Sequence, residues 1–160
     1  MAATYEPIAT ATLATESSSV DFSSIPSTFT DLVLVVTGTS SGTNINYGLR
    51  FNDTATSTYH ALRMYADGSS VMTDRLLSYS NSIISNISSA QSTAVIQFNG
   101  YSTSTLKKTF ISRSNSNGYV WLNAGLWNSN SAISKITFLT TTGYALQPGT
   151  TLSLYGIKAA

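Results

Sequence analysis

The chain has 160 residues, no Cys, a formal net charge of +1 and 9% charged residues, against about 25% in a typical soluble domain. This composition excludes a disulfide framework and a thiolate metal site, and it provides no electrostatic field that would hold a nucleic acid. A hydrophobic content of 42% excludes disorder, and no apolar run approaches the ~20 residues that span a bilayer, so we expect no membrane partner.

Alternation of apolar and polar residues predicts short strands through the first half of the chain. The most strongly apolar segment is Leu32–Val36, which is apolar at every position and rich in β-branched valine. That pattern is typical of a central strand buried on both faces. An Asp67-Gly68 turn is expected to close the last of these strands. The other strands are predicted over residues 5–13, 20–22, 47–51 and 60–66.

The segment from Val71 to Ile87 has no clear period. Its apolar residues suit either a short helix or two irregular strands, and they are Leu76, Leu77, Ile83, Ile84 and Ile87. The Ser and Asn residues between them have poor helix propensity, so we favour strand or loop.

In the second half, alternation again predicts strands, over residues 94–101, 107–113, 119–127, 136–138 and 152–154. The last of these, with Leu152 and Leu154, is expected to lie inside a sheet, because an exposed apolar edge would pair with other chains. About ten short strands separated by turns predict an all-β fold, an antiparallel β-sandwich of jelly-roll-like type, formed by residues 1–160 as a single domain.

The strand at 119–127 contains the candidate site. One of its faces carries Tyr119, Trp121, Asn123 and Trp127, and the other carries aliphatic residues. Aromatic rings on a flat sheet could stack on a sugar, with Asn123 supplying hydrogen bonds. The same rings could equally form a second buried layer or a subunit interface. An exposed patch of this size on a charge-poor monomer promotes aggregation, which favours coverage by the fold or by another chain.

No residue pattern predicts catalysis, a cofactor or a metal site. His60 is the only histidine, and no Gly-x-Ser-x-Gly elbow accompanies it, so a partly exposed His at a strand end is expected. A calcium site formed by Asp53, Asp67 or Asp74 stays open, although no EF-hand spacing is present. Turn and cap formation is the favoured interpretation of these acids. We therefore predict a protein that is not an enzyme.

The only basic cluster is Lys107-Lys108 with Arg113. Alternation places Lys107 and Arg113 on one face of a strand and Lys108 on the other. We expect a solvated or intersubunit face here rather than a site for a polyanion.

Several segments resemble small virion structural proteins of tailed bacteriophages, and the likeness covers the chain from about Tyr5 to Ala160. The segments are Phe22–Pro26, Thr30–Val36, Leu49–Asn52, Gly125–Trp127, Ala132–Thr137 and Leu154–Lys158. The resemblance implies a β-sandwich that assembles on the virion as an oligomer, frequently a trimer. It carries no catalytic residues.

Two roles in the virion follow from this resemblance. A capsid decoration (cement) protein would clamp subunits of the major capsid protein, whereas a tail-fibre or receptor-binding domain would contact tail proteins and bind host surface carbohydrate. We expect decoration, because the first predicted strand begins by Tyr5 and leaves no room for a coiled coil or shaft before it. A free-standing lectin or carbohydrate-active enzyme is the alternative from another class, and no paired acids support the enzyme.

Overall fold

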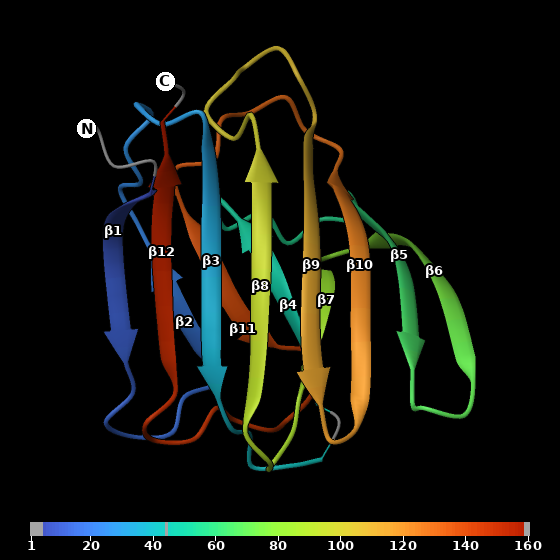
Figure 1. Ribbon diagram of the computed structural model, residues 1–160. Helices are drawn as coiled ribbons and strands as arrows, with labels where there is room; N and C mark the ends of the chain where they lie inside the picture. Colours follow the sequence, from blue (N-terminus) through green and yellow to red (C-terminus); the bar gives the residue numbers. More distant parts are fainter. Residues whose placement is uncertain (1–4, 44, 159–160) are drawn as a thin grey trace.

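The computed structural model describes residues 5–43 and 45–158, with the backbone only at residue 85. These residues form two antiparallel sheets that pack face to face (Figure 1). The predicted all-β antiparallel sandwich is confirmed. The strands are β1 (Tyr5–Thr12), β2 (Ser19–Phe22), β3 (Asp31–Gly38), β4 (Ile45–Phe51), β5 (Tyr59–Ala66), β6 (Val71–Tyr79), β7 (Ser82–Ile87), β8 (Ser92–Asn99), β9 (Lys108–Ser116), β10 (Tyr119–Trp127), β11 (Ile136–Thr140) and β12 (Thr151–Ile157).

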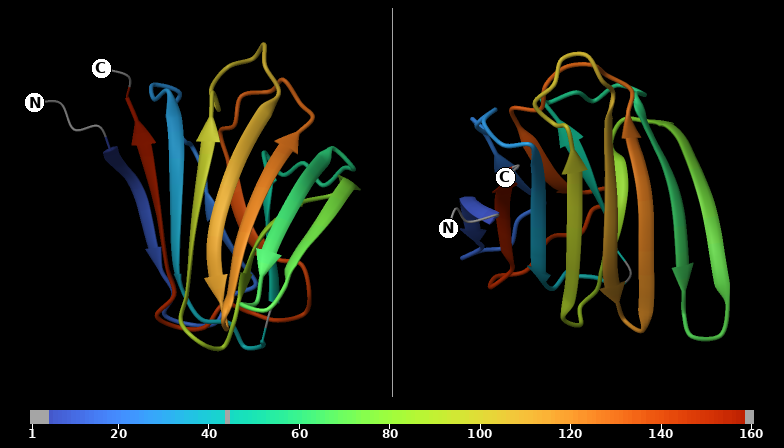
Figure 2. Two further views of the ribbon diagram at one scale, coloured as in Figure 1. Left: turned by 45° about the vertical axis from the view of Figure 1, so that its right-hand side comes forward. Right: turned by 45° about the horizontal axis from the view of Figure 1, so that its top comes forward.

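The two sheets differ in size. The large sheet has eight strands in the order β1-β12-β3-β8-β9-β10-β5-β6, and the small sheet has four in the order β2-β11-β4-β7. The chain crosses repeatedly from one sheet to the other, as in jelly-roll-like sandwiches. Figure 2 shows the hairpin of β5 and β6 at one side of the large sheet, with the small sheet behind the other strands.

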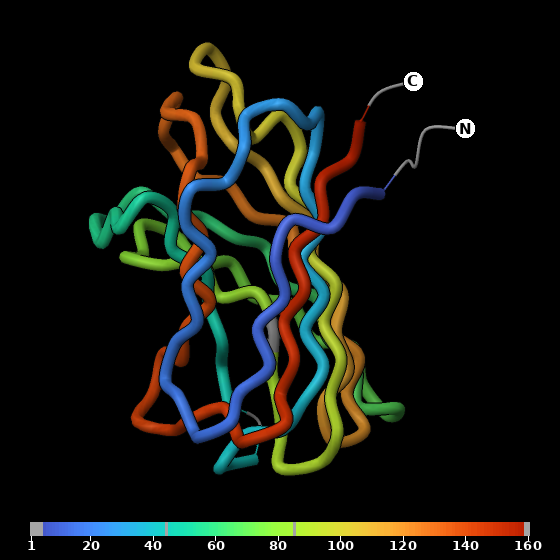
Figure 3. Tube along the Cα trace, turned by 90° about the vertical axis from the view of Figure 1, so that its left-hand side faces the viewer, coloured from blue at the N-terminus to red at the C-terminus, as the bar shows by residue number. Residues whose placement is uncertain are grey.

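The last strand of the chain lies inside the large sheet, as predicted. β12 pairs with β1 on one side and with β3 on the other, so both of its edges are hydrogen-bonded. Figure 3 shows β1 and β12 running side by side. Leu152 and Leu154 of β12 are fully buried against the small sheet. The apolar residues of this strand are therefore core residues, and its backbone edges are covered.

The prediction of a central strand at Leu32–Val36 is also confirmed, whereas the prediction that both of its faces are buried holds only in part. β3 lies between β12 and β8, and its inward residues Leu32 and Leu34 are fully buried. Val33, which points to the opposite side of the sheet, is also buried, with 5% of its surface exposed. Val35, the next outward residue, is only half-buried, and in the described part of the chain no further layer covers this side of the large sheet, so the strand is central but is fully buried only on its inner face.

Aromatic rings fill the interior where the two sheets meet. Phe51 of β4 lies at the centre of this cluster, with its ring centroid 5.4 Å from that of Trp127 and 5.8 Å from that of Phe98. Tyr59 adds a ring 5.8 Å from Phe51, and its hydroxyl group accepts a hydrogen bond from the backbone nitrogen of Phe51 at 2.9 Å. These contacts join β4 of the small sheet to β5, β8 and β10 of the large one.

The segment 71–87 forms two strands that belong to different sheets. β6 is the edge strand of the large sheet beside β5, and β7 is the edge strand of the small sheet beside β4. Near the end of β6, Ser78 has a left-handed φ of 59°. The strand alternative is therefore confirmed over the helix. β7 lies across β9, β10 and β5, so its apolar residues pack into the interior of the sandwich.

The turns use the residues that the sequence indicates. The Asp67 carboxylate accepts hydrogen bonds from the backbone nitrogens of Ser69 and Ser70, at 2.9 and 2.8 Å, while Gly68 has a φ of 88°. These bonds hold the pKa of Asp67 below its usual value. Asn117 and Gly118, with φ values of 45° and 84°, form the tight turn between β9 and β10. In the described part of the chain, no helix is long and apolar enough to cross a membrane.

Candidate interaction surface

β10 lies between β9 and β5 and has one face toward the small sheet and one toward solvent. The inner face carries Trp121, Asn123, Gly125 and Trp127, whereas Val120, Leu122, Ala124 and Leu126 point outward. The predicted alternation of the strand is therefore confirmed. Which face is inside is decided by the packing of the two sheets, which also determines what the candidate site residues contact.

Trp127 belongs to the aromatic core. Only 2% of its surface is exposed, and its ring stacks on Tyr59 at 6.3 Å and lies 5.4 Å from Phe51. Sheets that pack about 10 Å apart need side chains of this volume to fill the space between them. Trp127 is therefore a packing residue that connects β10 to β4 and β5.

Asn123 is a buried hydrogen-bonding residue. Its amide nitrogen donates to the carbonyl oxygen of Ile84 at 2.7 Å and to the hydroxyl oxygen of Ser112 at 2.9 Å. The Ser112 hydroxyl group donates to the same Ile84 carbonyl at 2.5 Å. These bonds attach the irregular strand β7 to the inner face of β9 and β10, so Asn123 positions β7 rather than a ligand.

Trp121 and Tyr119 lie in a second aromatic group near the β5–β6 hairpin. The Trp121 ring stacks on Tyr65 with centroids 4.2 Å apart, and the Arg63 guanidinium lies 5.7 Å from its centroid. Arg63 also donates to the Asp74 carboxylate of β6 at 2.6 Å. Tyr119 is partly exposed, with its ring 6.0 Å from that of Trp121. This group fastens the hairpin to β10.

The four sequence-predicted site residues therefore lie on the inner face. Trp121, Asn123 and Trp127 are 7%, 3% and 2% exposed, so in this structure neither indole ring presents a surface on which a sugar could stack. The sequence left three interpretations of these residues open, which were a sugar platform, a second buried layer and a subunit interface. Their positions match the buried layer. The reason is volume, because rings of this size on the outer face would leave the space between the sheets unfilled. A contact of the partly exposed Tyr119 with another chain stays a prediction.

The opposite face of these strands is aliphatic and exposed. We define the outer apolar face as the outward residues of β9, β10, β5 and β6, which the strand register arranges in rows. They are Asn115, Val120, Ala66 and Val71 in the first row, Arg113, Leu122, Met64 and Thr73 in the second, Ile111, Ala124, Leu62 and Arg75 in the third, and Thr109, Leu126, His60 and Leu77 in the fourth.

The centre of the outer apolar face is open to solvent. Leu122 and Met64, which are directly opposite each other on β10 and β5, are 42% and 44% exposed. Val120, Leu62 and Ile111 around them are 59%, 57% and 55% exposed. The face has apolar depressions, one of them lined by Met64, Leu122 and Ile111. The described part of this chain therefore leaves an aliphatic surface uncovered.

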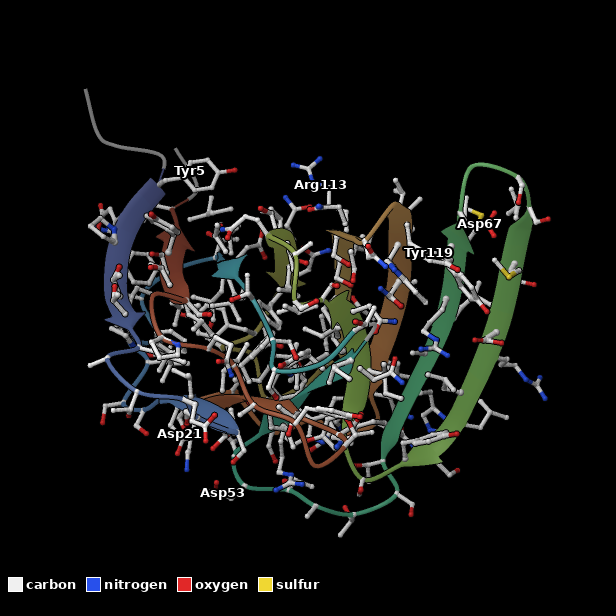
Figure 4. All side chains as sticks on the ribbon, turned by 90° about the horizontal axis from the view of Figure 1, so that it is seen from below. Tyr5, Asp21, Asp53, Asp67, Arg113 and Tyr119 are labelled. Carbon is white, nitrogen blue, oxygen red and sulfur yellow. The ribbon has the colours of Figure 1, made fainter. Side chains whose placement is uncertain are left out.

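Charge on the outer apolar face is limited to two arginines. Arg113 is on β9 in the second row, and Arg75 is on β6 in the third row, so they occupy opposite margins. None of the residues that define this face is acidic. Figure 4 shows the sandwich end-on, with Arg113 on the outer side of the large sheet and Asp21 and Asp53 on the side of the small sheet. An apolar centre with a polar margin is the usual anatomy of a protein interface.

The residues weighed for chemistry have structural partners. His60 accepts a hydrogen bond through Nδ1 from the backbone nitrogen of Ser78 at 3.4 Å. Asp53 pairs with Lys135 at 2.7 Å and Asp74 pairs with Arg63, while Asp67 forms its turn. Among residues 5–43 and 45–158, no group of three or more His, Cys, Asp or Glu side chains could hold a metal ion.

The prediction of a solvated or intersubunit face for the basic cluster is wrong for Lys108. Lys107 and Arg113 are exposed, but Lys108 is only 1% exposed and lies on the inner face. Its ammonium group donates to the Leu106 carbonyl, to the Thr103 hydroxyl at 3.3 Å and to the Asn130 carbonyl at 3.4 Å. Burial lowers the pKa of Lys108. It connects two loops, and it is not part of a solvated or intersubunit face.

Comparison with known proteins does not assign the chain to a family. No protein-family model matches the chain, and no curated protein sequence is significantly similar to it. An exo-inulinase from Aspergillus awamori is similar at a TM-score of 0.44 with 12% identity, over 96% of this chain and 29% of that chain. A galectin from Caenorhabditis elegans is similar at a TM-score of 0.37 with 9% identity, over 94% of this chain and 96% of that chain. The assignment of the fold rests on the strand pairing described above.

Sequence reasoning did not identify the outer apolar face, because it weighed only the aromatic side of β10 as a candidate surface and left open whether that side is buried. One signal in the sequence could have identified the inward side of β10. Gly125 lies on the aromatic face, and a Cβ atom at this position would be 2.0 Å from the ring of Phe110. A glycine inside a strand often marks close approach of another part of the protein, which indicates the inward side.

Proposed function

We propose that this chain is a structural protein of a tailed-bacteriophage particle, and that it acts as a capsid decoration protein through protein–protein contacts. The observation that carries the proposal is the outer apolar face, which is aliphatic at its centre and has arginines only at its margins. The resemblance of the sequence to small virion structural proteins gives the setting, the virion.

The size of the outer apolar face supports a role in assembly. Strands spaced ~4.8 Å apart and rows spaced ~6.8 Å apart give the face a footprint of roughly 500 Å², of which its apolar residues occupy roughly 330 Å². The largest apolar patch on a typical monomer is about 300–600 Å², and such patches often mark interaction sites. With 9% charged residues, the rest of the surface offers little repulsion to oppose association.

The chemistry of the face favours a flat protein partner. Aliphatic side chains on a sheet provide shape and apolar area but few hydrogen-bond donors or acceptors. A partner would therefore be recognised by burial of apolar surface, while Arg75 and Arg113 form polar contacts at the rim. In a decoration protein, covered faces of this kind join sister subunits, and the assembled unit then clamps the capsid surface.

The alternative role, a tail-fibre or receptor-binding domain for carbohydrate, depended on exposed aromatic rings. Trp121 and Trp127 are buried, so this alternative has lost the feature that suggested it. The outer apolar face offers aliphatic side chains in place of aromatic ones, and these lack the flat π-surface on which sugars stack.

The proposed function can be tested on virus particles that lack this protein. Purified protein is added to them, and bound protein is measured after the particles are sedimented, together with their resistance to heat and chelator. We expect the wild-type protein to bind and to restore resistance. Leu122→Lys, which places a charge at the centre of the face, should weaken binding by about tenfold or more. Leu106→Lys is the matched control, because Leu106 is 61% exposed and lies outside the face.

Two results would overturn the proposal. One is that particles without the protein are as resistant as complete particles and bind none of it. The other is that cryo-electron microscopy of complete particles places the protein on the tail. Equal loss of binding in both lysine variants would argue against the outer apolar face as the contact.

A further inference from the structure

We infer that a second copy of this chain covers the outer apolar face, with the two faces packed against each other around a twofold axis. The inference deepens the proposed function, since it names the partner of that surface and rests on the same face. It follows from where the chain exposes apolar residues and from where it places the two arginines.

The chain offers this face one apolar counterpart, which is the face itself. The exposed large hydrophobic residues outside it are separated from one another in the described structure: Tyr5 on β1, Tyr79 at the end of β6, and Leu106 and Tyr144 in loops. None of these forms a second cluster comparable to the outer apolar face. A sister subunit can therefore match apolar surface with apolar surface only when it presents the same residues, and such a contact is isologous.

The arginines do not oppose this arrangement. If the twofold axis runs along the strands, each row of one copy faces the same row of the other with the strand order reversed. Arg113 then lies opposite Thr73 of the second copy, and Arg75 lies opposite Ile111. If the axis runs across the strands, Arg113 faces Ile111 and Arg75 faces Thr73. In neither case does an arginine meet an arginine, and both side chains can reach solvent at the margin.

The centre of the contact is apolar in both orientations. With the axis along the strands, Leu122 faces Met64 of the second copy, and with the axis across the strands it faces Ala124. No polar or charged side chain lies at this centre, so the main cost of closing such an interface is avoided there. The two cases predict different neighbours for Leu122, so the axis can be determined experimentally.

The area of the contact determines how stable the dimer should be. Two footprints of roughly 500 Å² bury about 1,000 Å² in total, which is at the lower limit for a specific interface. We therefore expect a dimer that forms in a concentration-dependent way. A twofold contact closes at two copies, whereas the trimer implied by the resemblance requires a different, heterologous contact. A measurement of molecular mass in solution distinguishes the dimer from the trimer.

The first experiment is sedimentation velocity of the full chain over a range of concentrations. We expect the wild-type protein to shift from monomer to dimer, and Leu122→Lys to remain monomeric throughout. Leu106→Lys should behave like the wild type. Circular dichroism of each variant shows whether it is folded, so loss of the dimer can be separated from loss of the fold.

The second experiment uses disulfide cross-linking, which is clean because the chain has no native Cys. Leu122→Cys is mixed with Met64→Cys or with Ala124→Cys and oxidised. Mixed dimers should form with Met64→Cys if the axis runs along the strands, and with Ala124→Cys if it runs across them. Leu106→Cys is the control, and it should give several-fold less cross-linked product than the preferred pair.

The inference is overturned if the wild-type protein stays monomeric at every concentration, or if cross-linking at Leu106→Cys equals that at the face. It is also overturned if a trimer forms that Leu122→Lys leaves intact. A monomer that binds particles through Leu122 would show that a different virion protein covers the face, and the proposed function would then stand without the inference. A dimer that binds no particle would leave the inference standing and refute the function.

Discussion

β10 presents two faces that have similar apolar content and different surroundings. The inner face, with Trp121 and Trp127, packs against the small sheet and the β5–β6 hairpin, while the outer face, with Val120 and Leu122, is exposed. The inner face even includes a polar residue, Asn123, whereas every outward residue of β10 is apolar. Apolar character therefore does not by itself identify the core side of a strand.

Volume and geometry make the difference between the two faces. Indole and phenol rings fill a space between sheets that aliphatic side chains of this number would leave partly empty. Branched and unbranched aliphatic side chains lie low on the outer face and leave it flat enough to meet another flat surface. The inner face should thus govern stability, and the outer face should govern association.

The largest effect is expected from Trp127→Ala. Trp127 is 2% exposed and contacts Phe51 and Tyr59, so its removal leaves a cavity that the two sheets cannot close. We expect a loss of about 3–5 kcal/mol in the free energy of unfolding, measured by urea denaturation followed by circular dichroism. Leu122→Ala on the outer face is the comparison and should cost less than about 1 kcal/mol. Equal losses would refute the difference between the faces.

The next largest effect on stability is expected at alkaline pH, through Tyr59 in the interior of the sandwich. Burial raises the pKa of Tyr59 to about 12, from an ordinary value of 10.0. Between these values the unfolded chain loses the phenol proton while the folded chain keeps it, so stability falls as pH rises. The loss attributable to Tyr59 should reach about 2–3 kcal/mol near pH 12.

Tyr59→Phe isolates this contribution. Tyr47 and Tyr101, whose pKa values burial also raises, remain in both proteins, so only the difference between wild type and variant reports on Tyr59. At neutral pH the variant should be less stable by about 1 kcal/mol, because the Phe51 backbone nitrogen loses its acceptor. We expect that difference to shrink or reverse between pH 10 and 12. A constant difference would contradict the prediction.

The strands of the inner and outer faces could largely be predicted from sequence. Period-two alternation located β10, and the apolar run at Leu32–Val36 located a central strand of the large sheet. The Asp67-Gly68 turn followed from residue chemistry, because that chemistry is local. These features depend on neighbours along the chain, which the sequence contains.

The remaining features depend on segments that are distant in sequence. Whether Trp121 or Leu122 points inward is decided by β7, which crosses over β9 and β10 and which the sequence left between helix, strand and loop. Lys108 is buried because two loops supply oxygen acceptors at its ammonium group, and one of these acceptors is the carbonyl of Asn130. Such partners cannot be identified from alternation.

A moderate effect is expected from Gly125→Ala on the inner face. The added Cβ atom would lie 2.0 Å from the ring of Phe110, so either the ring or the backbone must move. We expect a loss of about 1–3 kcal/mol by the same denaturation measurement. Ala124→Val on the outer face should change stability by less than about 0.5 kcal/mol. Phe110→Leu combined with Gly125→Ala should cost less than the two single losses together, because both changes affect one contact.

The smallest effect on intrinsic stability is expected from Leu122→Lys. Leu122 is 42% exposed and lies on the outward side of β10, so at low protein concentration the free energy of unfolding should change by less than about 0.5 kcal/mol. At high concentration the comparison changes, because association of the outer faces stabilises only the folded state. The denaturation midpoint of the wild-type protein should then rise with concentration, while that of Leu122→Lys stays constant. If both midpoints are independent of concentration, the two faces of β10 differ in burial but the outer one does not pair with itself.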